Sequence, residues 1–141
     1  MAAPAFSWAR LWLGATVGAT VALILSWLVA PEIASVLVLG HGYEGPGSAT
    51  DSLLLADVAL SFLAFVLGAR LSHAIVRSKP YWACFAVGAL GWAFYLFEMG
   101  GFSGLFTGEY PLWYELAPTH WGASLLAARW AARDGGRPTA D

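Results

Sequence analysis

The chain has 141 residues, of which 59% are hydrophobic and only 11% are charged, with seven basic and nine acidic side chains. A soluble domain carries about 25% charged residues, so this chain has too few to cover a soluble surface. The composition therefore excludes an ordinary soluble enzyme, a disordered regulator and a nucleic-acid binder, which would need a basic stripe. The single cysteine, Cys84, excludes an intramolecular disulfide and an all-cysteine metal site.

Long apolar segments indicate a polytopic membrane protein. The hydrocarbon core of a bilayer is about 30 Å thick, and a helix needs roughly 20 apolar residues to cross it. Four segments meet this requirement: 11–30, 52–72, 81–99 and 111–132. We expect an all-α fold, a transmembrane four-helix bundle in a single membrane domain of residues 1–141, with outer loops at 31–51 and 100–110.

The first segment, 11–30, is uncharged and is followed directly by Pro31. Its length exceeds the apolar stretch of a signal peptide, and proline is unfavourable beside a cleavage site, so we interpret it as a retained span. Pro31 is expected to end or kink this helix. The apolar run 33–39 that follows fits either a short interfacial helix or a segment that re-enters the bundle, and its pattern leaves both open.

The second and third segments are joined by a short basic turn, which predicts antiparallel neighbours. Segment 52–72 carries Asp57 and Arg70, one near each end. Segment 81–99 begins after Pro80, and proline is favoured at the first position of a helix.

The fourth segment, 111–132, is the least hydrophobic. It contains Glu115, Pro118, His120 and Arg129. Ionisable residues in a span usually face other helices rather than lipid, so we expect this helix to pack inside the bundle.

The charges predict an orientation. All basic residues fall on one side of the four spans: Arg10, Arg70, Arg77, Lys79, Arg129, Arg133 and Arg137. The two predicted outer loops contain only acidic charges. The positive-inside rule therefore places both termini in the cytoplasm, and we expect an inner (plasma) membrane of the bacterial type.

Small residues indicate how the helices pack, because membrane helices approach closely where side chains are small. In the first segment Gly14, Gly18, Ala22 and Ser26 recur every four residues. We favour packing against another helix of the same bundle over a dimer interface between two copies. Gly88 and Gly91 are predicted to give the third helix a similar face.

Each of the other three helices has one stripe of small and polar residues. The stripes are Asp57, Ser61, Ala64 and Gly68; Cys84, Gly88, Gly91, Tyr95 and Glu98; and Glu115, Thr119, Gly122, Leu126 and Arg129. Each stripe has a carboxylate near its outer end, and we expect the three to face one another.

Acidic groups without nearby basic partners are the most function-like feature of the chain. The candidate ligands are Asp57, Glu98, Glu115 and His120, supported by Ser61, Tyr95 and Thr119. Buried carboxylates that face one another raise each other's pKa, so an outward-open pocket of these groups would bind a cation or relay protons. The alternative is that each acid is solvated near the interface. We expect no cofactor and no metal centre, because only one histidine lies at that depth.

The sequence contains no nucleotide-binding, hydrolase or metalloprotease motif. We therefore expect a non-enzymatic subunit or accessory protein in the bilayer, packing with itself as a homo-oligomer or with a larger membrane partner. A cation or proton transporter or sensor is the alternative. An intramembrane enzyme using Glu115 and His120 as acid and base is a weaker one.

Overall fold

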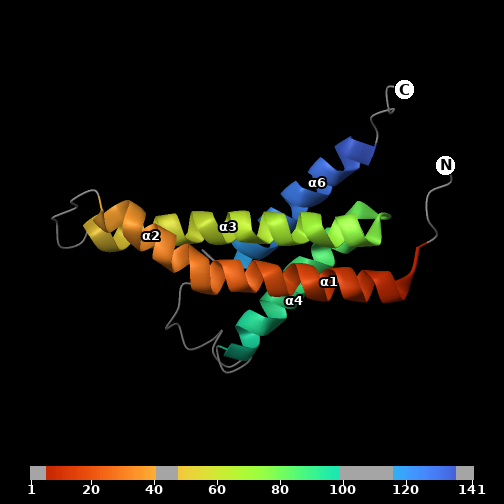
Figure 1. The fold of residues 1–141 in the computed structure, drawn as a ribbon, viewed down its shortest axis with the longest axis horizontal. Helices are drawn as coiled ribbons and strands as arrows, with labels where there is room; N and C mark the ends of the chain where they lie inside the picture. The colour runs from red at the N-terminus through yellow and green to blue at the C-terminus, as the bar shows by residue number, and fades with distance from the viewer. Residues whose placement is uncertain (1–5, 41–47, 99–115, 136–141) are drawn as a thin grey trace.

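The computed structural model describes residues 6–40, 48–98 and 116–135. Within these ranges the protein is helical and contains no strand (Figure 1), so the all-α prediction is confirmed. The elements in chain order are α1 (Trp8–Ile24), η1 (Leu25–Val29), α2 (Ala30–Leu39), α3 (Ser48–Val76), α4 (Pro80–Glu98), η3 (Leu116–Gly122) and α6 (Ala123–Gly135). The two η elements are π-helical.

Three helical stretches are long and apolar enough to cross a membrane. They comprise 31, 25 and 18 residues with mean hydropathies of 2.2, 2.1 and 1.3, and they are Trp8–Val38, Ser52–Val76 and Pro80–Phe97. Even the shortest extends about 27 Å at 1.5 Å per residue, close to the thickness of the hydrocarbon core. The fourth predicted span, 111–132, begins outside the described residues and stays a prediction.

The first helix bends near Pro31 and continues beyond it (Figure 1). Proline lacks an N–H, and its ring collides with the carbonyl four residues earlier, here that of Trp27. The π-helical turn η1 accommodates this, since the N–H of Ala30 donates to the carbonyl of Leu25, five residues back. Segment 33–39 is therefore part of α2, which follows the first helix directly through η1.

Helices α1 and α3 pack with their backbones in contact. A Cβ atom added to Gly18 would overlap the carbonyl oxygen of Gly68, and one added to Gly68 would overlap that of Gly18 and lie 2.8 Å from the Ala22 Cβ. One turn away, a Cβ on Gly14 would lie 2.9 Å from the carbonyl oxygen of Ser72. The small-residue stripe of α1 is thus covered by α3 within the same chain.

The same stripe continues through η1 into α2. Ser26 donates a hydrogen bond to Ser61 of α3 at 2.7 Å, and Ala30, Ala34 and Val38 are all buried. A four-residue spacing drifts by about 40° per step on a regular α-helix. The π-helical turn holds more residues than an α-helical turn and so opposes this drift.

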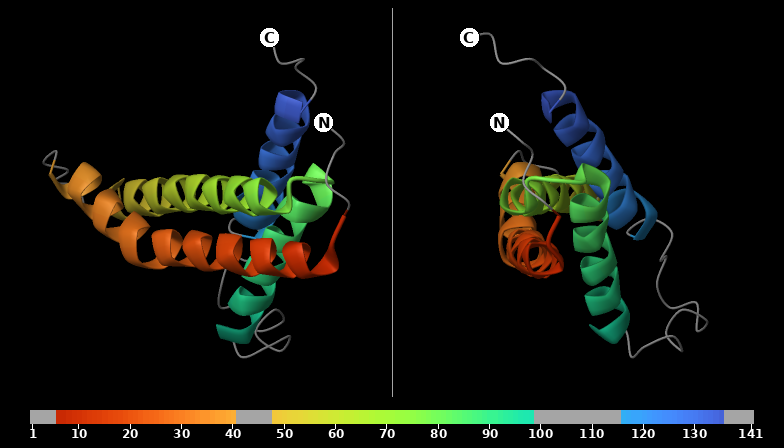
Figure 2. Two further views of the ribbon diagram at one scale, coloured as in Figure 1. Left: turned by 45° about the vertical axis from the view of Figure 1, so that its right-hand side comes forward. Right: turned by 90° about the vertical axis from the view of Figure 1, so that its right-hand side faces the viewer.

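A three-residue turn joins α3 to α4. Arg77 and Lys79 adopt left-handed conformations with φ of 57° and 44°, and the Arg77 N–H bonds the His73 carbonyl at 2.7 Å. A left-handed residue after the last helical residue is a common way to end a helix. Pro80 then begins α4, as predicted, and α4 crosses the α1–α3 hairpin at an angle, with α6 beside it (Figure 2).

Small side chains fill the spaces between the helices, and bulky apolar ones face outward. The main core contains Ala19, Ala22, Phe65, Val66, Ala69, Cys84, Val87, Ala123, Ala127 and Ala128. By contrast, Leu55 is 72% exposed and Phe97 is 79% exposed. An apolar surface of this kind suits lipid and would be a liability in water.

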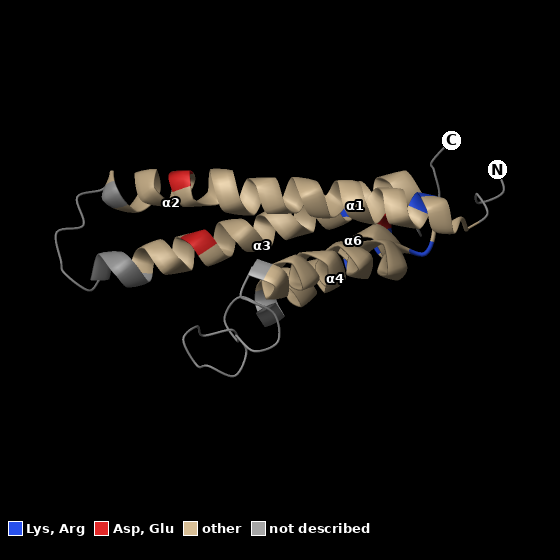
Figure 3. Ribbon diagram, turned by 90° about the horizontal axis from the view of Figure 1, so that it is seen from below, with Lys and Arg blue, Asp and Glu red and all other residues tan. Residues whose placement is uncertain are grey.

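Charged residues separate along the molecule. Lysine and arginine gather towards the end where α1 begins and α6 ends (Figure 3). The acidic residues Glu32 on α2 and Asp57 in the first half of α3 lie towards the opposite end. One acid, Asp134, shares the basic end, where it pairs with Arg70.

Candidate functional site

His120 is buried where three elements meet. It lies in η3 and is 5% exposed. Its ring centroid is 4.4 Å from that of Phe65 on α3 and 6.0 Å from that of Tyr95 on α4. Its Nδ1 atom is 3.0 Å from the Oγ1 atom of Thr119. The structure therefore brings together three of the predicted site residues, His120, Tyr95 and Thr119, in what we call the His120 cluster, completed by Phe65.

Two glycines of α4 make room for this cluster. A Cβ atom on Gly91 would overlap the Phe65 ring and lie 2.9 Å from Cδ2 of His120. A Cβ atom on Gly88 would lie 2.8 Å from the His120 carbonyl oxygen and 2.5 Å from the Ser124 hydroxyl. Because these two positions have no side chain, η3 and α6 can approach α4 closely there.

The last helix buries a different face from the one that its sequence pattern predicted. The predicted stripe runs through Thr119, Gly122 and Leu126 to Arg129, but Leu126 is 50% exposed and Arg129 is exposed. The buried residues instead are His120, Ala123, Ser124, Ala127, Ala128 and Ala131, together with Thr119. The positions from His120 to Ala131 recur at intervals of three and four residues, so they form one helical face centred on His120. The predicted stripe of this helix is therefore corrected beyond Thr119.

Three buried polar side chains bond to backbone carbonyls between or along the helices. Ser72 donates to Ala83 O at 3.0 Å, and Cys84 donates to Ala69 O at 3.5 Å. Ser124 donates to the carbonyl of His120 at 2.6 Å. Such hydrogen bonds satisfy polar groups within the bundle and hold neighbouring helices together.

Asp57 and Ser61 lie nearer the beginning of α3 than the His120 cluster does. Ser61 bonds Ser26 in η1, and Asp57 precedes Ser61 by one helical turn, so both lie on the side of α3 towards the first helix. Asp57 is half-buried and is eight residues from Phe65, or about 12 Å of helical rise from the His120 cluster.

The other two predicted acids cannot be placed in the same way. Glu98 is the last residue of α4, and its side chain lies outside the described part of the chain, as does Glu115. No group of three or more histidine, cysteine or acidic side chains that would suit a metal occurs among the described residues. The pocket of Asp57, Glu98, Glu115 and His120 stays a prediction.

An ion pair at the basic end was not predicted from the sequence. Arg70 of α3 donates to Asp134 of α6 at 2.7 Å, and its guanidinium carbon lies 4.6 Å from the ring centroid of Trp130. The Nη1 atom of Arg70 is buried and has no hydrogen-bond partner among the described residues. The attraction of the guanidinium to the Trp130 ring offsets part of the cost of this missing hydrogen bond. The partners are 64 residues apart, so no local sequence pattern could indicate the pair.

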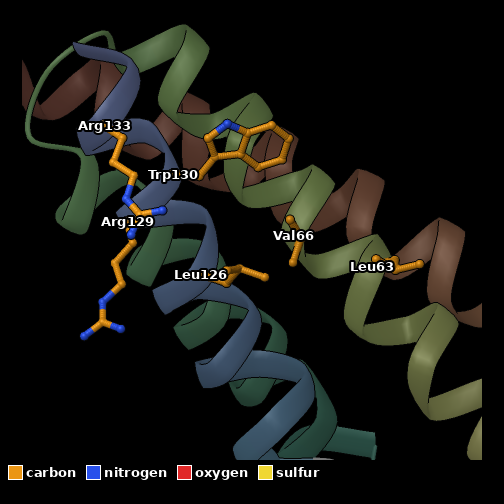
Figure 4. A pocket seen from close by; sticks show the side chains of 6 residues that line it. All are labelled: Leu63, Val66, Leu126, Arg129, Trp130 and Arg133. Atoms are coloured by element: carbon orange, nitrogen blue, oxygen red, sulfur yellow. The ribbon is translucent and has the colours of Figure 1, made fainter. Parts of the chain in front are cut away.

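A groove of about 390 Å³ lies between α3 and α6 (Figure 4), and we call it the α3–α6 groove. It is lined by Leu63, Val66, Leu126, Arg129, Trp130 and Arg133. Leu126 and Trp130 extend towards Val66 and Leu63, whereas the two arginines lie on successive turns of α6 (Figure 4). The groove is distinct from the His120 cluster and shares no residue with it.

Comparisons with protein-family models, with curated proteins and with solved structures found no match.

Proposed function

We propose that this chain is a non-enzymatic, four-span membrane subunit that packs with itself or with a larger membrane partner. The observation that carries the proposal is the shape of the α1–α3 hairpin. Its outer part, formed by α2 and the beginning of α3, projects beyond α4 and α6 (Figures 1 and 2). There α2 exposes Val36 and α3 exposes Leu55.

A two-helix projection has few neighbours of its own and offers faces on which another helix packs. Membrane helices associate through van der Waals contact and interhelical hydrogen bonds, and the described buried small residues in this part of the hairpin are Ala30 and Ala34 of α2. The buried hydroxyls of Ser72 and Ser124 bond within the bundle, which supports a packing role for them.

Photo-crosslinking in native membranes tests this proposal. A crosslinking residue replaces Val36 or Leu55, and in a matched control it replaces Leu13, an exposed residue of α1 far from the projection. We expect protein adducts from the first two positions, either between two differently tagged copies or with one reproducible membrane polypeptide. Lipid adducts alone at all three positions would contradict the proposal.

We propose further that both termini lie in the cytoplasm. The support is the separation of charge, with the described lysines and arginines towards the end where α1 begins and α6 ends (Figure 3). Residues 111–132 complete the fourth span in this arrangement, and the even number of spans returns the chain to its starting side.

A second candidate function, proton or cation movement, is favoured by the His120 cluster. An ionisable side chain buried in a membrane helix is a functional-site hypothesis by default, and π-helical turns are frequent at functional sites. His120 meets both conditions. In this proposal it acts with the predicted carboxylates Asp57, Glu98 and Glu115.

Flux measurements in liposomes test the second function. A pH gradient or cation gradient is applied to vesicles containing the purified protein. We expect the flux to be lost in His120→Gln. It should be retained in the matched control His73→Gln, because His73 lies in the last turn of α3, away from the His120 cluster. Wild-type protein without flux, or equal loss in the two variants, would contradict this function.

A further inference from the structure

The α3–α6 groove combines an apolar wall with two arginines at one end. We propose that it binds one anionic phospholipid, with the acyl chain in the groove and the phosphate on Arg129 and Arg133. This site goes beyond the proposed subunit function and involves none of the residues of the His120 cluster.

The apolar part of the groove suits a lipid chain. Val66 is buried, whereas Leu63, Leu126 and Trp130 are more than half or about half exposed, at 55%, 50% and 52%. The volume of about 390 Å³ is in the range of ligand pockets, which is about 300–1,000 Å³. Because the three partly exposed side chains face outward, the groove is entered from the side, where acyl chains lie.

The basic part carries charge that the described chain does not neutralise. Arg129 and Arg133 are four residues apart on α6, so they lie on one face, and both are exposed. Asp134 is adjacent in sequence but pairs with Arg70. Among the described residues no carboxylate forms an ion pair with either arginine. Guanidinium groups bind phosphate oxygens with paired hydrogen bonds, which favours a phosphate as the ligand.

The order of the residues along α6 matches that of a phospholipid. Leu126 comes first, and Arg129 and Arg133 follow at about 5 Å and 10 Å further along the helix. The arginines therefore lie towards the end of the molecule where basic residues gather (Figure 3). Basic pockets between membrane helices near the cytoplasmic surface of a bilayer bind anionic lipid headgroups.

The wall formed by Trp130 is held in place by the neighbouring ion pair. Arg70 stacks on the indole at 4.6 Å and is itself fixed by Asp134. Tryptophan is enriched at the level of lipid headgroups, which agrees with a boundary between chain and phosphate at this residue. A soluble phosphate would use the arginines alone, and an apolar helix would use the wall alone. An anionic lipid uses both.

Native mass spectrometry of the full chain tests the proposal. The protein is released from nanodiscs of phosphatidylcholine mixed with phosphatidylglycerol of the same acyl chains, and retained lipid is counted. We expect a preference for phosphatidylglycerol that falls about fivefold for each arginine removed in Arg129→Gln and Arg133→Gln. The matched control is Arg10→Gln with Arg77→Gln, which removes the same charge away from the groove.

A second variant tests the apolar half while both arginines remain. Leu126→Trp fills the groove from an exposed position, so the fold is retained, and the amount of bound phosphatidylglycerol should drop to that of phosphatidylcholine. Equal loss in the Arg10 and Arg77 control would overturn the proposal in favour of general surface charge. Unchanged retention in the Arg129 and Arg133 variants would also overturn it, as would full competition by soluble glycerol phosphate, which has no chain.

Discussion

Gly18 and Gly68 show how closely two helices of this protein approach. Each lacks a side chain at the point where the carbonyl oxygen of the other helix lies. A membrane gives helices no hydrophobic drive to associate, so the contact depends on van der Waals packing over the small-residue stripe. A single added side chain at this point acts on the whole α1–α3 interface.

Replacing Gly18 by leucine should therefore separate α1 from α3. We expect Gly18→Leu to lower the free energy of unfolding in detergent by about 1–3 kcal/mol, the usual cost of overpacking a close contact. Thermal unfolding monitored by circular dichroism measures this loss. Thr20→Leu is the control, since Thr20 is exposed on the same helix and should change stability by less than about 0.5 kcal/mol. Equal stability of the two variants would mean that Gly18 faces lipid.

Gly91 performs a related role beside His120. Its missing side chain leaves space for the Phe65 ring and for Cδ2 of His120. We expect Gly91→Ala to destabilise the protein by about 1–2 kcal/mol, because one of the two rings must move. The smaller side chain in Phe65→Leu should relieve part of this clash.

A double-mutant cycle of these two substitutions measures the relief. We expect the double variant to be more stable than the sum of the single losses by at least about 0.5 kcal/mol, since neighbouring residues couple. Additive losses would contradict the packing of His120 between Phe65 and Gly91.

Two π-helical turns determine how the longer elements of the protein run. Turn η1 immediately precedes α2, in which Pro31 is the second residue, and turn η3 contains Pro118. Proline cannot supply the N–H that an α-helix requires, and a wider turn accommodates it. Each turn is followed by an α-helix, α2 after η1 and α6 after η3. After η1 the residues that face α3 differ from those that an uninterrupted α-helix would place there.

The register of α6 can be tested with two adjacent residues. Ala127 is 0% exposed and Leu126 is 50% exposed, the reverse of what the predicted stripe through Thr119, Gly122 and Leu126 requires. We expect Ala127→Leu to lower the free energy of unfolding by about 1–3 kcal/mol and Leu126→Ala to change it by less than about 0.5 kcal/mol. Unfolding in lipid-free detergent measures both. The opposite ranking would support the predicted stripe through Leu126 instead.

At the scale of the whole molecule, the distribution of charge predicts the orientation in the membrane. Single cysteines introduced at Gly45 and Gly104 should react with an impermeant maleimide added outside cells, and a cysteine at Gly135 should react only after the membrane is opened. The unsubstituted protein is the control, because its own cysteine, Cys84, is buried. Reversed labelling at any of the three positions would contradict two cytoplasmic termini.

Sequence patterns predicted much of the helical framework and less of the candidate site. The stripe from Gly14 to Ser26 was visible because its residues recur within one helix. Tyr95, Thr119 and His120 were named as site residues, but their partner Phe65 was not, because a phenylalanine in an apolar helix has no distinguishing pattern. The hydrogen bond of Ser72 and the α3–α6 groove were not predicted either, because each is formed between residues of two different helices.

The sequence by itself determined that this protein is helical and that three of its helices are long and apolar enough to cross a membrane, because hydrophobicity and length are properties of consecutive residues. Only the tertiary structure decided which faces meet. Ser26 bonds Ser61 from 35 residues away, and Arg70 bonds Asp134 from 64 residues away. The π-helical turn η1 shifts the buried positions that follow it to Ala30, Ala34 and Val38, and a fixed period of 3.6 residues contains no record of that shift.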